Sequence, residues 1–330
     1  MNYFSSNFKL GILGGGQLGK MLLSDTRKFD IYTCVLAASK DAPSKIGSDE
    51  FYVGDLMDYD AVFNFGKKVD ILTVEIENIN VDALEDLEKE GVKVYPSSRT
   101  LRTIQNKATQ KLFYVDHKLP TAPFSRFAYT SEIKEAINHG GLSFPFVWKS
   151  AQFGYDGQGV KIVKSFEDLK DLPNVECIAE SLVTFKNELA VIVSRNVSGE
   201  TKTYPVVEME FHPEANQVEY VICPARISDE VAKKAIEVAL KTSEAFNHVG
   251  LLAVEMFQTI DDDILINEVA PRPHNSGHHT IESSYTSQFE QHIRAILNLP
   301  LGRTDSKVGG IMVNLEGAEG YTGDVVYQNI

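Results

Sequence analysis

The chain is short of cysteine, tryptophan and basic residues. Its 330 residues include three cysteines and one tryptophan, and 32 lysines and arginines stand against 46 aspartates and glutamates, a formal net charge of −14. Cys34, Cys177 and Cys223 form no Cys-x-x-Cys pair and no even framework, so we expect reduced thiols in a cytoplasmic protein. Because nucleic acid needs a basic surface, the acidic balance argues against nucleic-acid binding, whereas a local cluster of cations can still hold a small anion.

Long hydrophobic runs are also absent. No apolar stretch approaches the roughly 20 residues that a membrane-spanning helix needs. The opening Met-Asn-Tyr-Phe-Ser-Ser-Asn lacks the basic and then apolar segments of a signal peptide. The sequence therefore predicts a soluble cytoplasmic protein without a membrane partner. Its length is sufficient for two or three domains, each with its own core.

Roughly the first hundred residues alternate between strand-like and helical segments, as is typical of a parallel, doubly wound α/β sheet. A proline-containing stretch at 119–123 interrupts the pattern and marks a first domain boundary. We predict strands at 9–13, 31–37, 69–74 and 92–95, helices at 20–27 and 81–90, and one helix that runs from a cap at Ser97 or Ser98 to about residue 117.

Two further sections follow this break. The first is a small α/β segment, with strands predicted at 146–149, 160–163 and 177–180 around a glycine-rich loop. The second is rich in strands and contains a helix at 229–247, for which Ser228 is the expected N-cap and acids occupy the first turn. We therefore predict three domains, at 1–118, 119–183 and 184–330.

Two acidic residues, Glu255 and Glu268, fall on neighbouring predicted strands. The segments 251–260 and 264–270 are apolar and β-branched, and three aspartates separate them, which predicts a hairpin. The hairpin brings the two carboxylates together, where they repel each other unless a cation or a proton intervenes. Two carboxylates plus phosphate oxygens commonly hold Mg²⁺, so we predict a metal site here in preference to a solvated pair.

The segment 14–19 has the pattern Gly-x-Gly-x-x-Gly between a predicted strand and a predicted helix. Amides at a helix N-terminus can hold a phosphate, but this pattern alone is weakly specific. A dinucleotide site also needs an acid at the end of the second strand, where only Asp41 is available. We therefore favour a phosphate-bearing substrate over a nicotinamide cofactor, with tight-turn packing as the structural alternative.

A second glycine-rich loop, at 154–159, links two predicted strands and does not open a helix. It is no Walker loop, but a flap of this kind can close on triphosphate oxygens through its amides. Lys149 lies just upstream and is a candidate phosphate ligand. Residues 180–183 can offer backbone groups to an adenine edge, and Glu188 can take the ribose hydroxyls. Considered alone, the loop could equally be an ordinary hairpin. Lys149, considered alone, could equally be a solvated residue at the end of a strand.

In this order the motifs resemble those of the ATP-grasp superfamily, and more narrowly those of the 5-(carboxyamino)imidazole ribonucleotide synthase family of purine synthesis. The resemblance extends over nearly the whole chain and rests on 14–19, 75–77, 154–159 and 267–278. It implies an ATP-grasp architecture that combines α/β and α+β parts. It further implies a preATP-grasp domain, a small lid domain and a larger ATP-grasp domain, and the pairing of two chains as a homodimer.

The resemblance also implies a reaction. ATP and bicarbonate give carboxyphosphate and ADP, and the amine of 5-aminoimidazole ribonucleotide is then carboxylated as phosphate leaves. Mg²⁺ is held by Glu255 and Glu268, and Arg272, His274 and Asp156 take catalytic roles, Arg272 by stabilising charge on the transferred phosphoryl group. The matched nucleotide-binding positions are Lys107, Lys149, Phe153, Gly154, Tyr155, Asp156, Gly157, Gln158, Gly159, Glu180, Ser181, Leu182, Val183, Glu188, His212, Asn267 and Glu268. The matched substrate-binding positions are Gly15, Gly16, Gln17, Leu18, Glu75, Tyr155, His274, Asn275, Ser276, Gly277 and His278.

The chain departs from the family pattern at several points. Phe153 stands where many relatives have a small residue, Gln158 where a basic one is common, and His212 lies beside what looks like an insertion at 214–217. The family continues beyond the equivalent of residue 330 with a segment that carries lysine and arginine for the substrate phosphate. We therefore expect either an incomplete sequence or an incomplete substrate site.

Two other functions fit the same motifs. One is an ATP-grasp ligase for a different substrate, such as a formate-using purine ligase or another carboxylate–amine ligase. The other is a non-catalytic protein that binds ATP or a ribonucleotide without turnover. The segments 75–77 and 274–278 favour the carboxylating enzyme.

Overall fold

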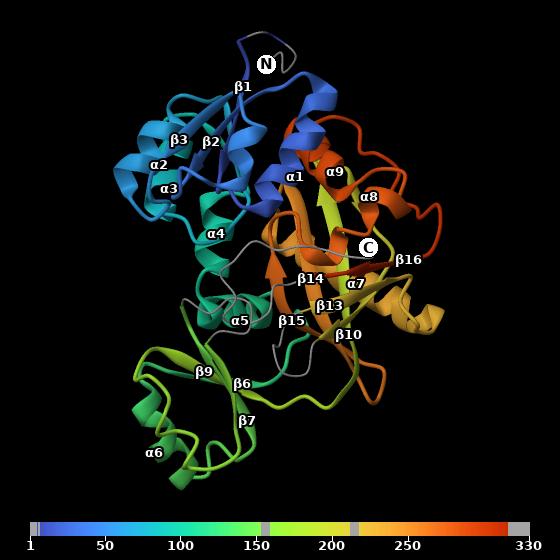
Figure 1. Ribbon diagram of the computed structural model, residues 1–330. Coiled ribbons are helices and arrows are strands. Elements are labelled where there is room, and N and C mark those ends of the chain that lie inside the picture. The colour runs from blue at the N-terminus through green and yellow to red at the C-terminus, as the bar shows by residue number, and fades with distance from the viewer. Residues whose placement is uncertain (1–4, 6, 153–158, 212–217, 316–330) are drawn as a thin grey trace.

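A computed structural model of the protein describes residue 5 and residues 7–152, 159–211 and 218–315. Its strands form three sheets, of five, four and seven strands. Figure 1 shows the five-stranded sheet at the top in blue, the four-stranded sheet at the bottom in green, and the seven-stranded sheet beside and between them in yellow to orange. Candidate site residues come from all three parts.

The N-terminal sheet is parallel throughout and has the order β3-β2-β1-β4-β5. Apolar helices cover both of its faces, which confirms the predicted doubly wound α/β sheet. Its strands are β1 (Lys9–Leu13), β2 (Tyr32–Ala37), β3 (Glu50–Val53), β4 (Ile71–Val74) and β5 (Lys93–Tyr95), and its helices are α1 (Gln17–Thr26), α2 (Tyr59–Gly66) and α3 (Val81–Lys89), with short 3₁₀ turns at Arg27–Phe29 and Pro43–Ile46.

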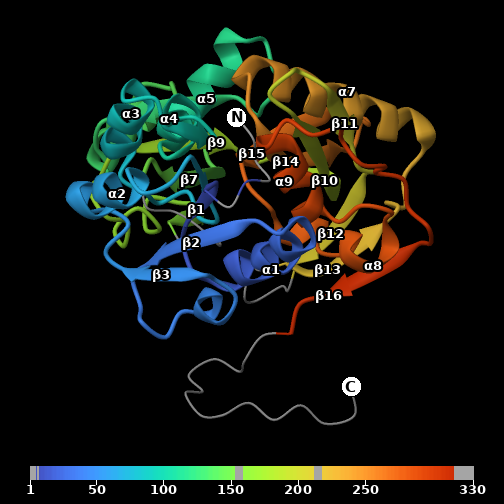
Figure 2. The same cartoon turned by 90° about the horizontal axis from the view of Figure 1, so that it is seen from above.

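A helix from far along the chain completes the core of this sheet. Helix α9 (Gln288–Ile296) places Phe289 and Ile293 against Leu22 and Leu23 of α1. Figures 1 and 2 show α9 beside α1 in both views. The Thr73 hydroxyl on β4 lies 2.8 Å from Nε2 of His292, so α9 also ties the first sheet to the rest of the molecule.

The single helix predicted up to about residue 117 is wrong, because the chain breaks it in two. Helix α4 (Ser98–Ile104) ends at Gln105, whose side chain donates to the carbonyls of Glu77 and Ile79. Asn106 then caps α5 (Lys107–Asp116) by accepting a hydrogen bond from the amide of Thr109. The break places Lys107 in the first turn of a new helix.

The small sheet is antiparallel and has the order β6-β9-β7-β8. Trp148 and Phe146 pack with Ile133 of α6 in its core. The three predicted strands are present, and β6 is an addition. The elements are β6 (Phe124–Phe127), a 3₁₀ turn at Thr130–Glu132, α6 (Ile133–Asn138), β7 (Phe146–Ser150), β8 (Val160–Val163) and β9 (Cys177–Ser181).

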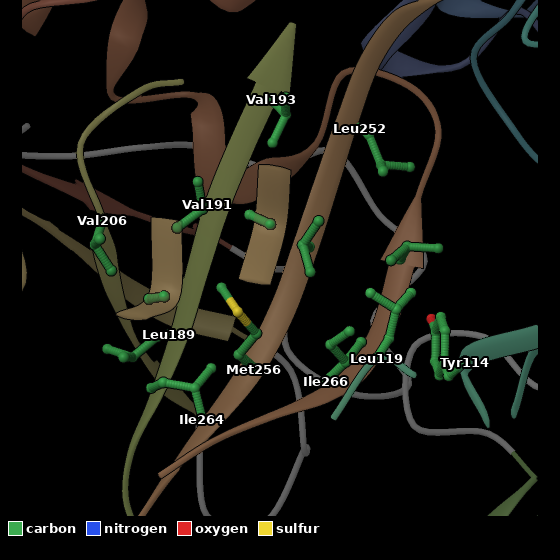
Figure 3. Packing of buried hydrophobic residues seen from close by; sticks show 14 of the residues in the cluster. Tyr114, Leu119, Leu189, Val191, Val193, Val206, Leu252, Met256, Ile264 and Ile266 are labelled. Atoms are coloured by element: carbon green, nitrogen blue, oxygen red, sulfur yellow. The ribbon is translucent and has the colours of Figure 1, made fainter. Parts of the chain in front are cut away.

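The large sheet is antiparallel, with the order β15-β14-β10-β12-β13-β16 and β11 beside β10. Helix α7 covers one face, where Leu189, Val191 and Met256 pack in the cluster that Figure 3 shows, with Tyr114 of α5 beside Leu119. Ser228 caps α7 as predicted, and the predicted hairpin is formed by β14 and β15. The elements are β10 (Phe185–Arg195), β11 (Thr201–Thr203), β12 (Val207–Phe211), β13 (Val218–Cys223), α7 (Asp229–Phe246), β14 (Gly250–Thr259), β15 (Ile264–Ala270), a 3₁₀ turn at Asn275–Gly277, α8 (Thr280–Ser283), α9 and β16 (Gly310–Val313).

Across the described ranges, no helix combines the length and the apolarity that a bilayer crossing requires.

Candidate functional site

The two predicted metal ligands lie directly opposite each other. Glu255 on β14 pairs with Glu268 on β15 in the antiparallel register. Residues opposite each other in such a pair project from the same face of the sheet. This face lies opposite the one that α7 covers, because Val254 and Met256 flank Glu255 and pack in the α7 cluster. The structure therefore brings the two carboxylates together on the face away from α7, as the hairpin predicts.

A β-bulge sits at this point in the hairpin. Glu268 is opposite Glu255 and Ile266 is opposite Met256, so Asn267 is an extra residue on β15. A bulge bends its strand and redirects side chains, and bulges are frequent beside active sites. Here Nζ of Lys149 donates to Oδ1 of Asn267 at 2.9 Å. The predicted nucleotide ligands Asn267 and Glu268 thus lie side by side, and one of them reaches the small sheet.

Lys107 neutralises one carboxylate of the pair. Its Nζ lies 2.6 Å from Oε2 of Glu268, and this nearby positive charge lowers the pKa of Glu268 to about 2, against the opposing effect of burial. Burial of the ammonium lowers the pKa of Lys107, but the charge and hydrogen bond of Glu268, together with the charges of Glu255 and Glu180, raise it on balance. The Glu268 side chain is still 42% exposed, so it remains accessible to a ligand.

His274 engages the other carboxylate. Its Nε2 lies 3.1 Å from Oε1 of Glu255, while its Nδ1 accepts from the Ser276 amide at 3.3 Å. With Nδ1 accepting, Nε2 carries the ring proton that faces Glu255. Gln288, at the start of α9, fixes the backbone of His274 from both sides, by accepting from its amide and donating to its carbonyl. His274 is thus placed to orient Glu255.

The segment after His274 is tightly packed. Ser276 and Gly277 are buried, and a Cβ added to Gly277 would lie 2.3 Å from Cδ1 of Ile192, so only glycine fits there. Burial, and then the charge of His274, lower the pKa of His278 to about 4, and its Nδ1 lies 3.0 Å from Nε2 of Gln288. Asn275 has a buried Oδ1 with no hydrogen-bond partner within the described part of the chain.

Arg272 reaches back to the first domain. Its Nε lies 2.8 Å from Oε1 of Glu77, which follows β4. Arg272 is 18% exposed and Glu77 is 21% exposed, so both lie partly shielded from solvent. The sequence motif at 75–77 includes Glu77, but the sequence prediction gives it no role.

Glu180 and Lys149 form a buried group with a residue that the prediction missed. Glu180 on β9 is 3% exposed, and its Oε2 lies 2.7 Å from Nζ of Lys149. Its other oxygen pairs with Nζ of Lys111, a residue of α5 that is 2% exposed. Burial alone raises the pKa of Glu180, but the attraction of Lys149 and Lys111 brings the net pKa below the ordinary value. Ser181 ends β9, and its amide donates to the carbonyl of Pro123.

Glu188 lies on β10 close to the carboxylate pair. Burial, together with repulsion from Glu255 and Glu268, raises its pKa to about 7. Ala190 is directly opposite Glu255, and Glu188 lies two residues before it on the same face of the sheet. A third acid therefore faces the same region, and because its pKa is about 7 it is partly protonated near neutral pH.

The first glycine loop already contains an anion of the protein. Glu75 accepts hydrogen bonds from the amides of Gly16 and Gly19, each at 2.7 Å. Gly14 has a φ of +106°, and a Cβ there would lie 2.3 Å from Cγ of Glu75. Glycine thus allows Glu75 to close onto the N-terminus of α1. The amides of Gly16 and Gly19, at which a substrate phosphate was expected, donate to this carboxylate instead.

Several predicted residues fall elsewhere. Phe153, Gly154, Tyr155, Asp156, Gly157, Gln158 and His212 lie outside the described residues. Gly159 is described, with a φ of +72°, and its carbonyl accepts from the amide of Ser150. The loop therefore connects the paired strands β7 and β8, as predicted. Leu182 is 42% exposed. Gln17 and Leu18 are the first two residues of α1, and Gly15 precedes the N-cap Gly16.

The acidic pair fits a divalent cation only together with other oxygens. No group of three or more histidine, cysteine, aspartate or glutamate residues is arranged to hold a metal ion within the ranges that the structure describes. A hard cation takes six or more oxygen ligands, and Mg²⁺ often takes one or two carboxylates plus substrate phosphates. Glu255 and Glu268 fit that second arrangement.

Comparison with protein families agrees with this geometry. The description "ATP-grasp domain" matches residues 112–289, and "Ribonucleotide synthetase preATP-grasp domain" matches residues 8–105. N5-carboxyaminoimidazole ribonucleotide synthase of Bacillus subtilis is 41% identical over 314 residues, which are 94% of this chain and 81% of that protein. Phosphoribosylaminoimidazole carboxylase of Candida albicans is 39% identical over 93% of this chain, which spans 56% of that longer protein.

Solved structures give the same result. The ADP complex of an N5-carboxyaminoimidazole ribonucleotide synthetase superposes with a TM-score of 0.87 at 41% identity, covering 93% of this chain and 81% of that one. The Aspergillus clavatus N5-carboxyaminoimidazole synthase, in complex with ADP and 5-aminoimidazole ribonucleotide, also has a TM-score of 0.87, at 36% identity, and covers 95% of this chain and 83% of its own.

The fold and the family matches define an ATP-grasp enzyme, with a parallel preATP-grasp sheet and antiparallel ATP-grasp sheets. Within that class, the chain belongs to the N5-carboxyaminoimidazole ribonucleotide synthase family.

Proposed function

We propose that the protein converts 5-aminoimidazole ribonucleotide to N5-carboxyaminoimidazole ribonucleotide at the expense of ATP, as a step of purine biosynthesis. Bicarbonate supplies the carboxyl group and Mg²⁺ accompanies the nucleotide. Membership in the N5-carboxyaminoimidazole ribonucleotide synthase family supports the overall reaction. The observation that carries the assignment of the site is the opposed pair Glu255 and Glu268, with lysines from two other elements beside it.

The nucleotide lies, in this proposal, between the small sheet and the large sheet. Lys107 and Lys149 bind its phosphates, because both ammonium groups end beside the bulge at Asn267 and Glu268. Residues 180–183 hold the adenine edge, and Glu188 accepts from the ribose hydroxyls. Phe153, the 154–159 loop and His212 remain predicted nucleotide contacts.

Glu255 and Glu268 would hold Mg²⁺ together with phosphate oxygens. When bound, the cation neutralises charge on the phosphates and orients them for transfer. His274 donates to Glu255 and so keeps that carboxylate turned toward the site, the usual task of a residue behind a metal ligand. Lys107 must move from Glu268 to the nucleotide phosphates as the metal site forms.

Phosphoryl transfer from ATP to a bicarbonate oxygen gives ADP and carboxyphosphate. The amine of the ribonucleotide then attacks the carboxyl carbon, the bond from carbon to the phosphate oxygen breaks, and the amine loses a proton. Arg272 stabilises the charge that develops on the transferred group. His274 and Asp156 stay proposed catalytic residues.

The ribonucleotide binds where the N-terminal domain meets the segment that follows β15, near Glu75, Gln17 and residues 274–278. In this proposal a donor of the substrate pairs with Oδ1 of Asn275, which has no hydrogen-bond partner among the described residues. A substrate phosphate at the amides of Gly16 and Gly19 would have to displace Glu75. We therefore assign the glycine loop to the ribose or the base, and not to the phosphate.

The test is ADP release with ATP, Mg²⁺ and bicarbonate, in the presence and absence of 5-aminoimidazole ribonucleotide. We expect strong stimulation by this ribonucleotide and little by glycinamide ribonucleotide or by formate with other purine precursors. Equal stimulation by another acceptor would contradict the proposed substrate. Nucleotide binding without stimulation would favour a non-catalytic protein. Light scattering of the same sample tests the proposed homodimer.

A further inference from the structure

Lys111 is a lysine in a place where lysine is rarely found. Its side chain is 2% exposed, and burial of a charged ammonium is costly unless partners compensate for the lost water. Desolvation lowers its pKa to about 8, even though the neighbouring Glu180 acts in the opposite direction. The charge of Lys111 therefore calls for an explanation.

The partners of Lys111 come from three parts of the fold. Its Nζ donates to the Glu180 carboxylate of β9 in the small sheet and to the Thr121 hydroxyl at 2.6 Å. The same Thr121 hydroxyl donates to the carbonyl of Ile266 at 2.9 Å, and Ile266 immediately precedes the bulge residue Asn267. The amide of Ile266 donates to the carbonyl of Pro120. Lys111 thus lies where α5, the small sheet and the edge of the large sheet meet.

Glu180 is held by two ammonium groups, and they differ in position. Lys111 is buried, and its acceptors among the described residues are Glu180, Thr121 and the carbonyl of Ile266. Lys149 also donates to Asn267, beside the carboxylate pair. If Lys111 neutralises Glu180, the positive charge of Lys149 is not consumed by Glu180 and can act on an anion at the bulge. Without Lys111, Glu180 competes for Lys149 with the full strength of a buried carboxylate.

We propose that Lys111 is a positioning residue of the nucleotide site, which neutralises Glu180 and thereby presents the Lys149 ammonium to the nucleotide phosphates. This role rests on the proposed nucleotide site. Lys111 touches no phosphate itself. It acts through Glu180, and its contacts with Thr121 and the Ile266 carbonyl also tie β9 to β15, the strand that carries Asn267 and Glu268.

Calorimetric binding of ADP with Mg²⁺ tests the proposal. Lys111→Met keeps the length and apolar volume of the side chain and should weaken ADP binding about tenfold or more, the size of a close charge coupling. Lys111→Arg keeps the charge and should recover a large part of the loss. Gln110→Met is the matched control, since Gln110 is a buried polar residue on the same helix. It should leave ADP binding unchanged even if it lowers the Tm.

The double variant Lys111→Met with Glu180→Gln separates charge neutralisation from packing. If Lys111 acts by neutralising Glu180, the double variant should bind ADP with an affinity within about threefold of that of Glu180→Gln alone. Under a purely structural role the two losses add, which overturns the proposal, as does unchanged ADP binding by Lys111→Met. Should Lys111→Met fail to fold, Lys111→Gln keeps a donor toward Glu180 and carries the same comparison.

Failure of this idea is distinct from failure of the proposed function. A wild-type protein that binds no ADP contradicts the nucleotide site itself. A wild-type protein that binds ADP, together with a Lys111→Met variant that binds it equally well, contradicts only the role of Lys111. Under saturating ATP the turnover number of Lys111→Met should stay within about threefold of wild type while the KM for ATP rises, because only nucleotide binding is affected.

Discussion

Oε1 of Glu77 lies 2.8 Å from Nε of Arg272, so a carboxylate of the first domain holds the arginine that follows β15, the strand that carries Glu268. The two residues are far apart in the sequence and leave the ends of β4 and β15, respectively. A guanidinium held in this way is oriented before any substrate arrives, which is the condition under which it stabilises developing charge most effectively. The contact also joins the two halves of the proposed site.

We predict that Glu77→Gln lowers the turnover number about tenfold, because Arg272 loses the partner that orients it, while the KM for ATP changes less than about threefold. Steady-state ADP release in the presence of the ribonucleotide measures both quantities. Glu85→Gln is a suitable control, since Glu85 pairs with Arg102 on the exposed surface of the same domain. A change in the KM for ATP alone, with the turnover number unchanged, would contradict a role of Glu77 in orienting Arg272.

Lys107 should compete with a metal ion for Glu268. We predict that Lys107→Met binds Mn²⁺ about tenfold more tightly than wild type in the absence of nucleotide, because Glu268 then lacks its counter-charge. Electron paramagnetic resonance of free Mn²⁺ measures this without any turnover. The exposed Lys118, just after the same helix, provides a control in Lys118→Met. Equal Mn²⁺ affinity in the two variants would show that Lys107 does not compete with the metal ion for Glu268.

Glu188 should make the stability of the nucleotide-free protein depend on pH. Its pKa is about 7 when folded and near the ordinary value when unfolded, so between these values the folded state holds a proton that the unfolded state releases. The free energy of unfolding therefore falls as pH rises through this window. Glu188→Gln should remove about 1–3 kcal/mol of that loss between pH 5 and pH 8.

Urea denaturation at the two pH values measures the effect of Glu188. Glu237→Gln, an exposed position on α7, serves as the control and should follow the wild type. If Glu188→Gln and the wild type lose equal stability between pH 5 and pH 8, the crowding of Glu188 by Glu255 and Glu268 is weaker than the structure indicates.

Much of the fold follows from local patterns in the sequence. The alternation of apolar strands and helices predicts the parallel sheet, and the two apolar runs around 261–263 predict the β14–β15 hairpin that opposes Glu255 and Glu268. These elements are set by periodicity and turn residues close in sequence, which a single chain displays.

The features that the sequence hides depend on distant partners. The bulge at Asn267 follows from a register that the β15 sequence does not display, and the break between α4 and α5 is stabilised by Gln105, which reaches back to Glu77 and Ile79. Lys111 gives no local signal, because a lysine on a helix is usually solvated. Glu75 is predicted as a substrate ligand, but its closure onto Gly16 and Gly19 depends on tertiary packing.

The most direct measurement is ADP release by Glu268→Gln and wild type, each with and without 5-aminoimidazole ribonucleotide, under saturating ATP, Mg²⁺ and bicarbonate. Glu282→Gln, an exposed position on α8, is the control. We expect wild type and control to be strongly stimulated, and Glu268→Gln to lose about a hundredfold or more of the stimulated rate while its circular dichroism spectrum is unchanged. Ribonucleotide-stimulated turnover by Glu268→Gln at the wild-type rate would contradict the assignment of the site to this carboxylate pair.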